Sequence, residues 1–220
     1  EKASAGRLPT DMLTFLRQGK PALDLAREIV ASATSTLPLS QIRLLAPVLN
    51  PPKIVAIGLN YLDHCREQNL KPPESPVLFA KFSTAVIGPG DAIRWDPSLT
   101  NQVDYEAELG VVIGRVARRV PTEQALDYVA GYTICNDVSA RDLQFKDGQW
   151  VRAKSLDTFC PIGPWIITRD AIPDPGNLAI SCLLNGQVMQ DSNTRELAFG
   201  VPELIAFISR AFTLLPGDVI

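Results

Sequence analysis

The sequence predicts a β-rich α+β fold, for two reasons. Segments with the length and composition of strands outnumber helical segments, and the helical segments do not alternate with them regularly. The predicted strands are KIVAIG, PVLFAKF, DAIRW, VDYEAELGVVIG, GYTICNDV and WIIT. A doubly wound parallel sheet would require regular alternation, so the pattern favours the α+β class.

A hairpin is predicted at LAISCLLNGQVMQ, residues 178–190. Asn185 and Gly186 stand between two strand-like runs, and both residue types accept the positive φ angles of a type I′ turn. This is the clearest local signal for antiparallel pairing in the chain.

Helices are expected in four regions. Residues 10–34 predict two short amphipathic helices around GKPA, with Thr10 or Asp11 capping the first. The others are expected at 60–68, at 122–130 with Thr122 as the cap, and at 202–214 with Pro202 in the first turn.

With 220 residues, the chain suits one sizeable domain with a small appendage. Residues 1–50 are expected to form a small helical extension and a linker, and residues 51–220 the catalytic domain. The chain begins without methionine and stops at LLPGDVI, where a strand is expected to begin. We therefore expect the domain to be truncated at its C-terminal end.

Composition excludes several classes of function. The hydrophobic fraction is 46%, the net charge is −3, and no basic stripe is present. Binding to nucleic acid or to an anionic membrane is therefore not expected. The four cysteines are scattered and form no CxxC motif, which favours a reducing compartment, most simply the cytoplasm. An organelle-targeting segment removed from the N-terminus stays open as an alternative.

The segment VDYEAELGVVIG, residues 103–114, carries three acids at alternate positions. In one continuous strand, Asp104, Glu106 and Glu108 would point to the same face. Since the strand runs into the apolar residues VVIG, its acidic half is expected to line a cleft. Two carboxylates about 4 Å apart repel by roughly 4 kcal/mol at an effective dielectric near 20, so a cleft must raise a pKa or hold a cation.

A further acid, Asp137, ends the apolar strand GYTICNDV and could supply a third oxygen. Three hard carboxylate oxygens favour Mg²⁺, Mn²⁺ or Ca²⁺ over Zn²⁺. The alternative is that Glu106 and Glu108 only solubilise an edge strand, and the local pattern does not choose between the two interpretations.

A second cluster lies in NDVSARDLQ and WVRAKSLDTFCPIGPW. Arg141, Gln144 and Lys154 are donors that could bind a substrate carboxylate or a developing oxyanion. Taken singly, such side chains usually lie on a solvated surface. Their proximity in sequence to three large aromatic residues and several prolines indicates a pocket wall; the aromatic residues are Trp150, Phe159 and Trp165.

His64 is the only histidine, and Glu67 follows it at the i+3 position of a predicted helix. A carboxylate beside an imidazole fixes its tautomer and raises its basicity, as a general base requires. An exposed helical ion pair is the alternative. The zinc-protease, nucleophile-elbow, phosphate-loop and dinucleotide-binding motifs are absent from the sequence.

Four segments, taken in order, resemble the fumarylacetoacetate hydrolase superfamily: IGLNYLDHCREQ, DYEAELGVVIG, NDVSARDLQ and KSLDTFCPIGPW. The resemblance covers roughly residues 50–220 and is strongest to small members with a single catalytic domain. These include acylpyruvate hydrolases, oxaloacetate decarboxylases and oxaloacetate tautomerases. The resemblance implies a mixed β-sandwich roll, a homodimer, and one Mg²⁺ or Mn²⁺ in each active site.

The resemblance also implies roles for particular residues. The metal ligands would be Glu106, Glu108 and Asp137. The base dyad would be His64 and Glu67, carried on a mobile segment that orders over the substrate. The groups that bind substrate oxygens and stabilise the intermediate would be Arg141, Gln144 and Lys154.

The reaction expected first is metal-dependent hydrolysis of a carbon–carbon bond in an acylpyruvate-type 2-oxo acid, because the dyad gives water a base. Keto–enol tautomerisation or decarboxylation of oxaloacetate is the main alternative. Isomerisation or decarboxylation of an aromatic-degradation intermediate is another. A non-catalytic relative that binds a small ligand is the alternative from a different class.

Overall fold

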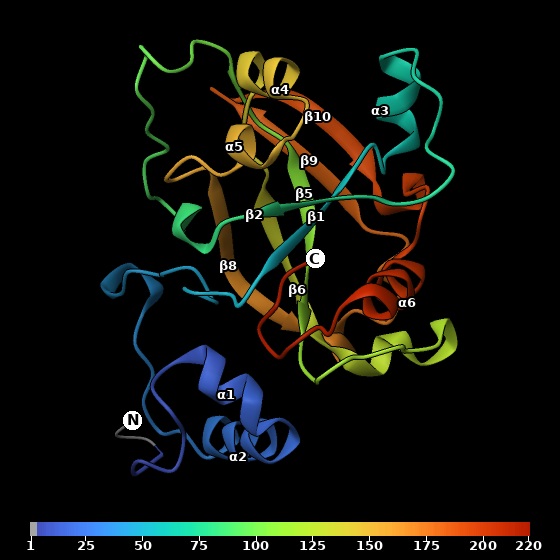
Figure 1. The fold of residues 1–220 in the computed structure, drawn as a ribbon. Coiled ribbons are helices and arrows are strands. Elements are labelled where there is room, and N and C mark those ends of the chain that lie inside the picture. The colour runs from blue at the N-terminus through green and yellow to red at the C-terminus, as the bar shows by residue number, and fades with distance from the viewer. Residues whose placement is uncertain (1–3) are drawn as a thin grey trace.

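The computed structural model describes residues 4–220, and its centre is a four-stranded sheet. The strand order is β3 (Val86–Ile87), β8 (Cys160–Thr168), β6 (Val129–Asn136) and β5 (Ala107–Ile113). The β5–β6 and β6–β8 pairs are antiparallel, whereas β3 pairs with β8 in parallel. The α+β class and the mixed sheet predicted from the sequence are thus confirmed (Figure 1).

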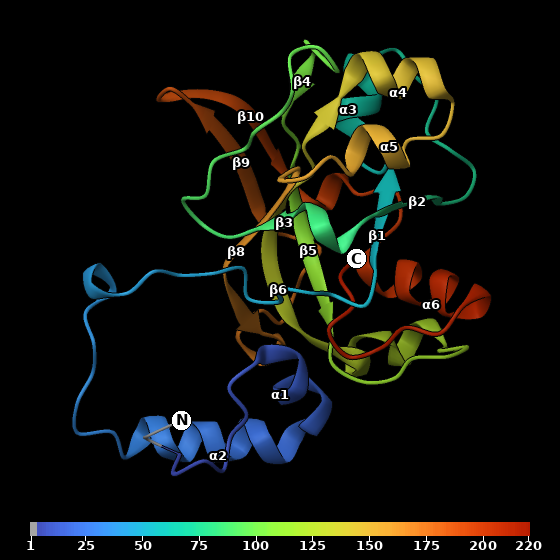
Figure 2. The ribbon, with the colours of Figure 1, turned by 60° about the vertical axis from the view of Figure 1, so that its left-hand side comes forward.

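A second pair, β1 (Ile54–Gly58) and β2 (Val77–Lys81), is joined to this sheet by the last residues of the chain. The amide of Val55 donates to the carbonyl of Val219 at 2.8 Å, and the amide of Val111 donates to the carbonyl of Ile220 at 2.7 Å. Residues 218–220 pair with both β1 and β5. They therefore connect the β1–β2 pair to the central sheet (Figure 2).

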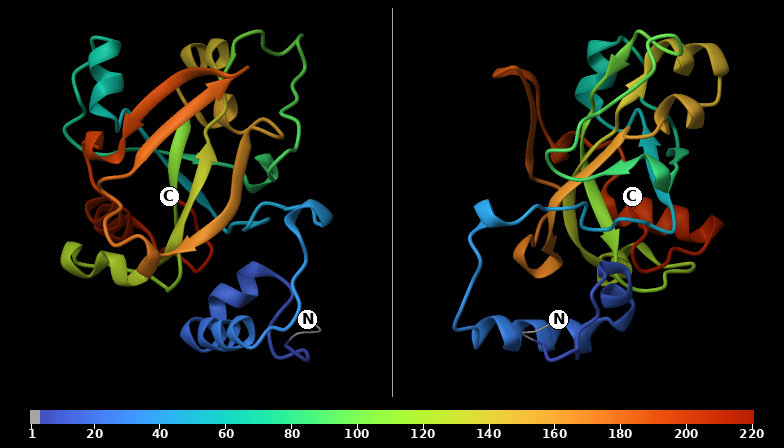
Figure 3. Two further views of the ribbon diagram at one scale, coloured as in Figure 1. Left: turned by 180° about the vertical axis from the view of Figure 1, so that it is seen from behind. Right: turned by 90° about the vertical axis from the view of Figure 1, so that its left-hand side faces the viewer.

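The predicted hairpin consists of β9 (Ala179–Leu184) and β10 (Gln187–Asn193). Asn185 has φ 52° and Gly186 has φ 79°, so the turn prediction is confirmed. Figure 3 shows the tip of the hairpin standing away from the rest of the molecule.

The largest apolar core forms where α6 (Val201–Ala211) packs on the central sheet. Pro202 lies in the first turn of α6, as predicted. The predicted helix at 122–130 is a 3₁₀ segment, η3 (Thr122–Tyr128), and Pro121 occupies its cap position. The prediction that Thr122 is the cap is therefore wrong, because Thr122 is already inside the first turn.

The N-terminal region forms α1 (Met12–Gln18) and α2 (Lys20–Ala31). The carboxylate of Asp11 accepts a hydrogen bond from the amide of Thr14 at 2.8 Å, so Asp11 is the cap of α1. Leu16 packs against the core residues Val48 and Ile54, which anchors the extension to the sheet. The domain boundary near residue 50 stays a prediction.

The other elements are short. The predicted strand DAIRW has no regular structure, because the hydroxyl of Thr158 satisfies both the amide and the carbonyl of Arg94. No helix in 4–220 is both long enough and apolar enough to cross a membrane. The remaining elements are α3 (Leu62–Glu67), α4 (Arg141–Asp147), α5 (Val151–Lys154), β4 (Val103–Asp104), β7 (Ser139–Ala140), η1 (Leu39–Gln41), η2 (Ser83–Ala85), η4 (Arg169–Ala171) and η5 (Thr194–Glu196).

The β6–β8 contact can be tested at Gly131. A Cβ at this position would overlap the backbone carbonyl of Ile167 on the neighbouring strand. We expect Gly131→Ala to lower the free energy of unfolding by about 1–3 kcal/mol, because a backbone atom cannot turn aside as a side chain can. Urea denaturation measures the change. Gly200→Ala is the control, since its Cβ would meet nothing closer than 3.8 Å; equal stability of the two variants would contradict the strand contact.

Candidate functional site

The acidic segment 103–114 is not the continuous strand that the sequence predicted. β4 ends at Asp104 and β5 begins at Ala107. At the break, the amide of Glu106 donates to the side chain of Asn136 at 3.1 Å, and the carbonyl of Glu106 accepts from the amide of Asp137 at 2.9 Å. This local pairing brings Glu106 beside Asp137, by a route that strand alternation did not predict.

A buried ammonium group joins these two carboxylates. Lys154 Nζ lies 2.7 Å from Glu106 Oε2 and 2.9 Å from Asp137 Oδ2. Lys81 Nζ lies 2.7 Å from the other oxygen of Asp137. Both lysines are buried, so their charges interact with the acids through little intervening water.

Glu108 is the uncompensated acid of the group. Within residues 4–220, its carboxylate has no hydrogen bond or ion pair. Burial, together with the charges of Glu106 and Asp137, raises the pKa of Glu108 well above its usual value. Burial acts in the same direction on the pKa of Asp137, but Lys81 and Lys154 outweigh it and hold that pKa below its usual value. Among the described residues, Glu108 is thus the acid of the cluster without a cation partner, and its surroundings favour the protonated form.

The donor set has the chemistry of a hard-cation site, but the carboxylates do not enclose a cation position. In the part of the chain that the structure describes, no three His, Cys, Asp or Glu side chains converge closely enough to hold a metal ion. The ammonium of Lys154 stands where Glu106 and Asp137 face each other. Each carboxylate oxygen that bonds a lysine keeps a second lone pair. The donor types therefore match those that Mg²⁺ or Mn²⁺ prefers, and a bound ion would require Glu108 and the ammonium of Lys154 to move.

Arg141, at the start of α4, is held by acids. Its Nη2 lies 2.7 Å from Glu106 Oε1 and 2.8 Å from Asp104 Oδ2. Burial lowers the pKa of Arg141, but the charges of Glu106 and Asp104 outweigh it and raise that pKa. Gln144, one turn later, accepts a hydrogen bond from Arg141 Nη1 at 2.9 Å. In this structure Gln144 therefore orients Arg141.

Aromatic side chains support the lysine end of the site. Lys154 Nζ lies 5.3 Å from the centre of the Phe79 ring, a cation–π distance. Phe79 meets Trp150 edge-on at 5.4 Å between ring centres, and Gly58 leaves room for the Trp150 ring. Of the other predicted aromatic residues, Phe159 is buried in a separate apolar cluster and Trp165 lies half exposed on β8.

Lys81 is the functional residue that sequence reasoning missed. Besides Asp137, its ammonium donates to the carbonyl of Val138 at 3.3 Å and to the carbonyl of Lys154. The available signal was a lysine at the end of the apolar strand VLFAK, since a buried lysine requires acceptors. Lys81 links the strand segment at Asp137 to the helix that presents Lys154.

The proposed dyad on α3 is loosely arranged. His64 Nδ1 lies 3.9 Å from Glu67 Oε2, beyond hydrogen-bond distance, and the Glu67 side chain is 81% exposed. The Nε2 atom of His64 lies 3.0 Å from the side-chain nitrogen of Gln68. Within residues 4–220 neither member of the dyad bonds to the acidic cluster. The structure thus places His64 and Glu67 together on one helix without coupling them.

Helix α3 is tied to the end of the β9–β10 hairpin. Arg66 Nη2 lies 2.7 Å from Glu196 Oε2, and the hydroxyl of Ser192 donates to the carboxylate of Asp63. These contacts hold the helix from residues on either side of His64. The histidine therefore sits on a docked helix with its own side chain 36% exposed.

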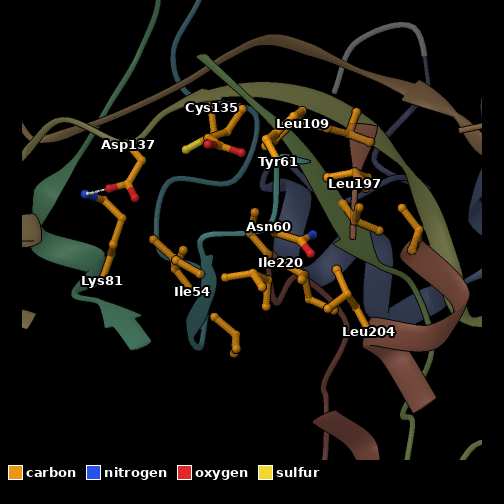
Figure 4. A pocket seen from close by; sticks show the side chains of 18 residues that line it. Ile54, Asn60, Tyr61, Lys81, Leu109, Cys135, Asp137, Leu197, Leu204 and Ile220 are labelled. Atoms are coloured by element: carbon orange, nitrogen blue, oxygen red, sulfur yellow. Dashed lines mark hydrogen bonds and ion pairs between the residues drawn. The ribbon is translucent and has the colours of Figure 1, made fainter. Parts of the chain in front are cut away.

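A cavity lies between β1, β5 and α6 (Figure 4). Lys81, Asp137 and Glu108 contribute to its wall, and most of the remaining surface is apolar. The hydroxyl of Tyr61 is buried there without a hydrogen-bond partner. A charged end and apolar walls suit a small organic acid better than a polymer.

Comparison with known proteins shows the family to which the chain belongs. Residues 53–220 match the family model described as the fumarylacetoacetate (FAA) hydrolase C-terminal domain. The chain is 46% identical over 214 residues to the mitochondrial oxaloacetate tautomerase Fahd2a of Rattus norvegicus, covering 97% of this chain and 68% of the rat protein. The chain belongs to the fumarylacetoacetate hydrolase family.

Two solved structures show the range of reactions in this family. The 5-carboxymethyl-2-hydroxymuconate delta-isomerase from Mycobacterium smegmatis is 47% identical, with a TM-score of 0.76 over 84% of this chain and 69% of that one. The maleylpyruvate hydrolase from Sphingobium sp. SYK-6, solved with manganese(II) and pyruvate, is 34% identical. Its TM-score is 0.81 over 95% of this chain and 73% of that one. The chain's relatives are thus enzymes that act on small acids.

The role of Lys81 predicts a large effect on stability. Lys81→Met leaves one oxygen of the buried Asp137 carboxylate without its partner, and breaking a buried pair costs about 3–5 kcal/mol. We expect a loss in that range by urea denaturation. Lys20→Met is the control, because Lys20 forms an exposed ion pair with Asp24 and little change is expected there. A Lys81 variant as stable as the Lys20 variant would show that the buried pair is not formed.

Proposed function

We propose that the protein is a divalent-metal-dependent keto–enol tautomerase of oxaloacetate or a similar 2-oxo dicarboxylic acid. The observation that carries this proposal is the 46% identity to an oxaloacetate tautomerase over 97% of the chain. The maleylpyruvate hydrolase is less similar, at 34%. The relatives therefore favour tautomerisation over acylpyruvate hydrolysis, the reaction that the motifs alone ranked first.

In this proposal Glu106, Glu108 and Asp137 hold one Mg²⁺ or Mn²⁺. Three features support these ligands: their hard oxygen donors, the carboxyl group of Glu108 without a cation partner in residues 4–220, and the Lys154 ammonium that already bridges Glu106 and Asp137. A bound ion would supply Lewis-acid stabilisation of the negative charge that develops on a 2-oxo acid. Manganese(II) in the Sphingobium structure supports an ion of this class.

Lys154 and Arg141 would bind the substrate's carboxylate oxygens. Both already bond to the carboxylate of Glu106 in this structure, which supports a role in binding acidic groups. Gln144 would hold the guanidinium in place while its acid partners are exchanged for substrate. Guanidinium and ammonium groups differ in geometry, so Arg141 suits a planar carboxylate and Lys154 a single oxygen.

His64 would carry the proton. Tautomerisation moves one proton between carbon 3 and the oxygen on carbon 2, so a single base that later acts as an acid is sufficient. His64 is the only histidine in the chain, and Glu67 would orient its ring when substrate draws the two together. The 3.9 Å separation suits a pair that tightens when substrate binds.

Isomerisation of an aromatic-degradation intermediate is the second candidate, supported by the 47% identity to the M. smegmatis isomerase. The chemistry is related, because both reactions relocate a proton on an unsaturated acid. Turnover of a substrate panel separates the candidates: oxaloacetate, acetylpyruvate, fumarylpyruvate and a 2-hydroxymuconate.

The decisive measurement is the ultraviolet absorbance of the oxaloacetate enol. We expect Mg²⁺ or Mn²⁺ to support rapid tautomerisation, EDTA to remove it, and Glu108→Gln to weaken metal binding measured by calorimetry. His64→Ala should lower kcat by about 10²–10⁴-fold, the usual contribution of a general base, while metal binding is retained. Lys20→Ala, on exposed α2, is the control for handling and folding.

Other outcomes would redirect the assignment. Hydrolysis of acetylpyruvate without tautomerisation of oxaloacetate would restore the hydrolase interpretation. If the His64→Ala variant tautomerises oxaloacetate at the parental rate, His64 is not the residue that transfers the proton. Metal binding without turnover of any substrate in the panel would favour the ligand-binding alternative.

We also propose that the chain forms a homodimer, with the β9–β10 hairpin at the contact. The hairpin exposes Leu183, Val188 and Met189, and the adjoining strand β8 exposes Trp165 and Ile167. Exposed apolar patches of this kind mark interaction surfaces more often than chance. The cytoplasmic location expected from the scattered cysteines stays a prediction, and the rat relative is named mitochondrial.

Light scattering on the purified chain tests the dimer. We expect a particle of twice the chain mass, and Leu183→Glu should shift it to the monomer because a carboxylate would be buried at the contact. Gln187→Glu, at an exposed position beside the turn, adds the same charge and should leave the dimer intact. A monomeric parent chain at high concentration would rule out the proposed contact.

A further inference from the structure

Two thiols of the central sheet lie in contact. Cys135 on β6 pairs across the strands with Ile162 on β8, and Cys160 lies two residues before Ile162. Because side chains alternate along a strand, Cys135 and Cys160 project from the same face of the sheet. Their sulfur atoms are 3.6 Å apart, and both residues are buried, at 7% and 0% exposure.

One of these thiols borders the cavity. Cys135 lies in its wall together with Asp137 and Lys81, and Figure 4 shows the three side chains at the same end. Cys135 is 7% exposed and borders the cavity, whereas Cys160 is 0% exposed and does not line it, so a small reagent in the cavity would reach Cys135 before Cys160. The sulfur of the fully buried Cys160 lies 3.6 Å from that of Cys135. The arrangement resembles an attacking thiol with a resolving thiol beside it.

We propose that Cys135 and Cys160 are a redox-active pair that hydrogen peroxide converts to a disulfide. The Cys135 sulfur attacks one peroxide oxygen, the O–O bond breaks, and a sulfenic acid and one water form. The Cys160 sulfur then attacks the sulfenic sulfur, forming the S–S bond and releasing a second water. The two thiols supply the two electrons that reduce the peroxide, and their two protons end in the two waters.

The geometry favours the Cys135–Cys160 bond over other pairings. A disulfide has a sulfur separation of about 2.0 Å, so the contact has to shorten by roughly one and a half ångströms. Cys65 bonds through its thiol to the carbonyl of Leu59 and lies on α3, and Cys182 lies on β9. Closure of the bond would also strain the segment that carries Asp137, two residues after Cys135.

The test maps disulfides after oxidation of the folded full-length chain. Reduced protein is treated with hydrogen peroxide, unfolded in N-ethylmaleimide, digested with trypsin and analysed by mass spectrometry. We expect three of the four thiols to be lost to alkylation: Cys182 by oxidation without a partner, and Cys135 and Cys160 through a disulfide that links their two peptides. Dithiothreitol should restore Cys135 and Cys160. Trypsin separates the two cysteines because Arg141 and Lys154 lie between them.

Cys182 provides an internal standard, because it is partly exposed and reacts with peroxide without a partner. Cys135 is 7% exposed, so we expect it to react more slowly than the partly exposed Cys182. The Cys182→Ser variant should still form the bond, whereas Cys160→Ala should not. If Cys182 is fully oxidised while Cys135 and Cys160 both remain alkylatable, the proposal is overturned. No step depends on catalytic activity, so the result is independent of the proposed function.

Discussion

The buried ion pairs around Asp137 are the interaction on which the site depends. Two ammonium groups, from Lys81 on β2 and Lys154 on α5, bond to the two oxygens of one carboxylate. Removing such charges from water is costly, and the cost is offset only when every charge has a partner. The cluster therefore fixes the positions of β2, β6 and α5 relative to one another. Glu108 is the exception, and an acid left without a partner in such a cluster indicates a function other than stability.

The fold supplies this cluster from segments that are far apart in sequence. β5 and β6 bring Glu106 and Asp137 together at a break in the ladder, and the antiparallel β1–β2 pair delivers Lys81. Residues 218–220 join the two parts of the sheet. The irregular backbone at the site is thus a consequence of the sheet ending there, where the side-chain oxygens of Asn136 and Gln190 accept hydrogen bonds in place of ladder carbonyls.

The sequence predicted the parts of the molecule that depend on local chemistry. The Asn185–Gly186 turn, the capping Asp11 and Pro202 at the start of α6 are confirmed, since each follows from the conformational preference of one or two residues. The β4–β5 break was not predictable, because it depends on Asn136, thirty positions away from Glu106. Lys81 was missed for the same reason: its three acceptors come from two other segments. Local patterns singled out the acids but gave the wrong geometry for Asp104, which bonds to Arg141.

The arrangement of His64 bears on which reaction the site performs. A hydrolase must orient a water molecule as well as the substrate, so its base needs a fixed position before water attacks. His64 is one-third exposed, lies 3.9 Å from Glu67 and contacts Gln68 instead. A proton relay between adjacent atoms of one bound substrate is less demanding, because the substrate itself positions both the donor and the acceptor atom. Arg66 and Asp63 hold α3 against the hairpin. Rotation of the imidazole therefore breaks fewer contacts than movement of the whole helix would. A loosely held base on a docked helix therefore fits proton relocation better than activation of water.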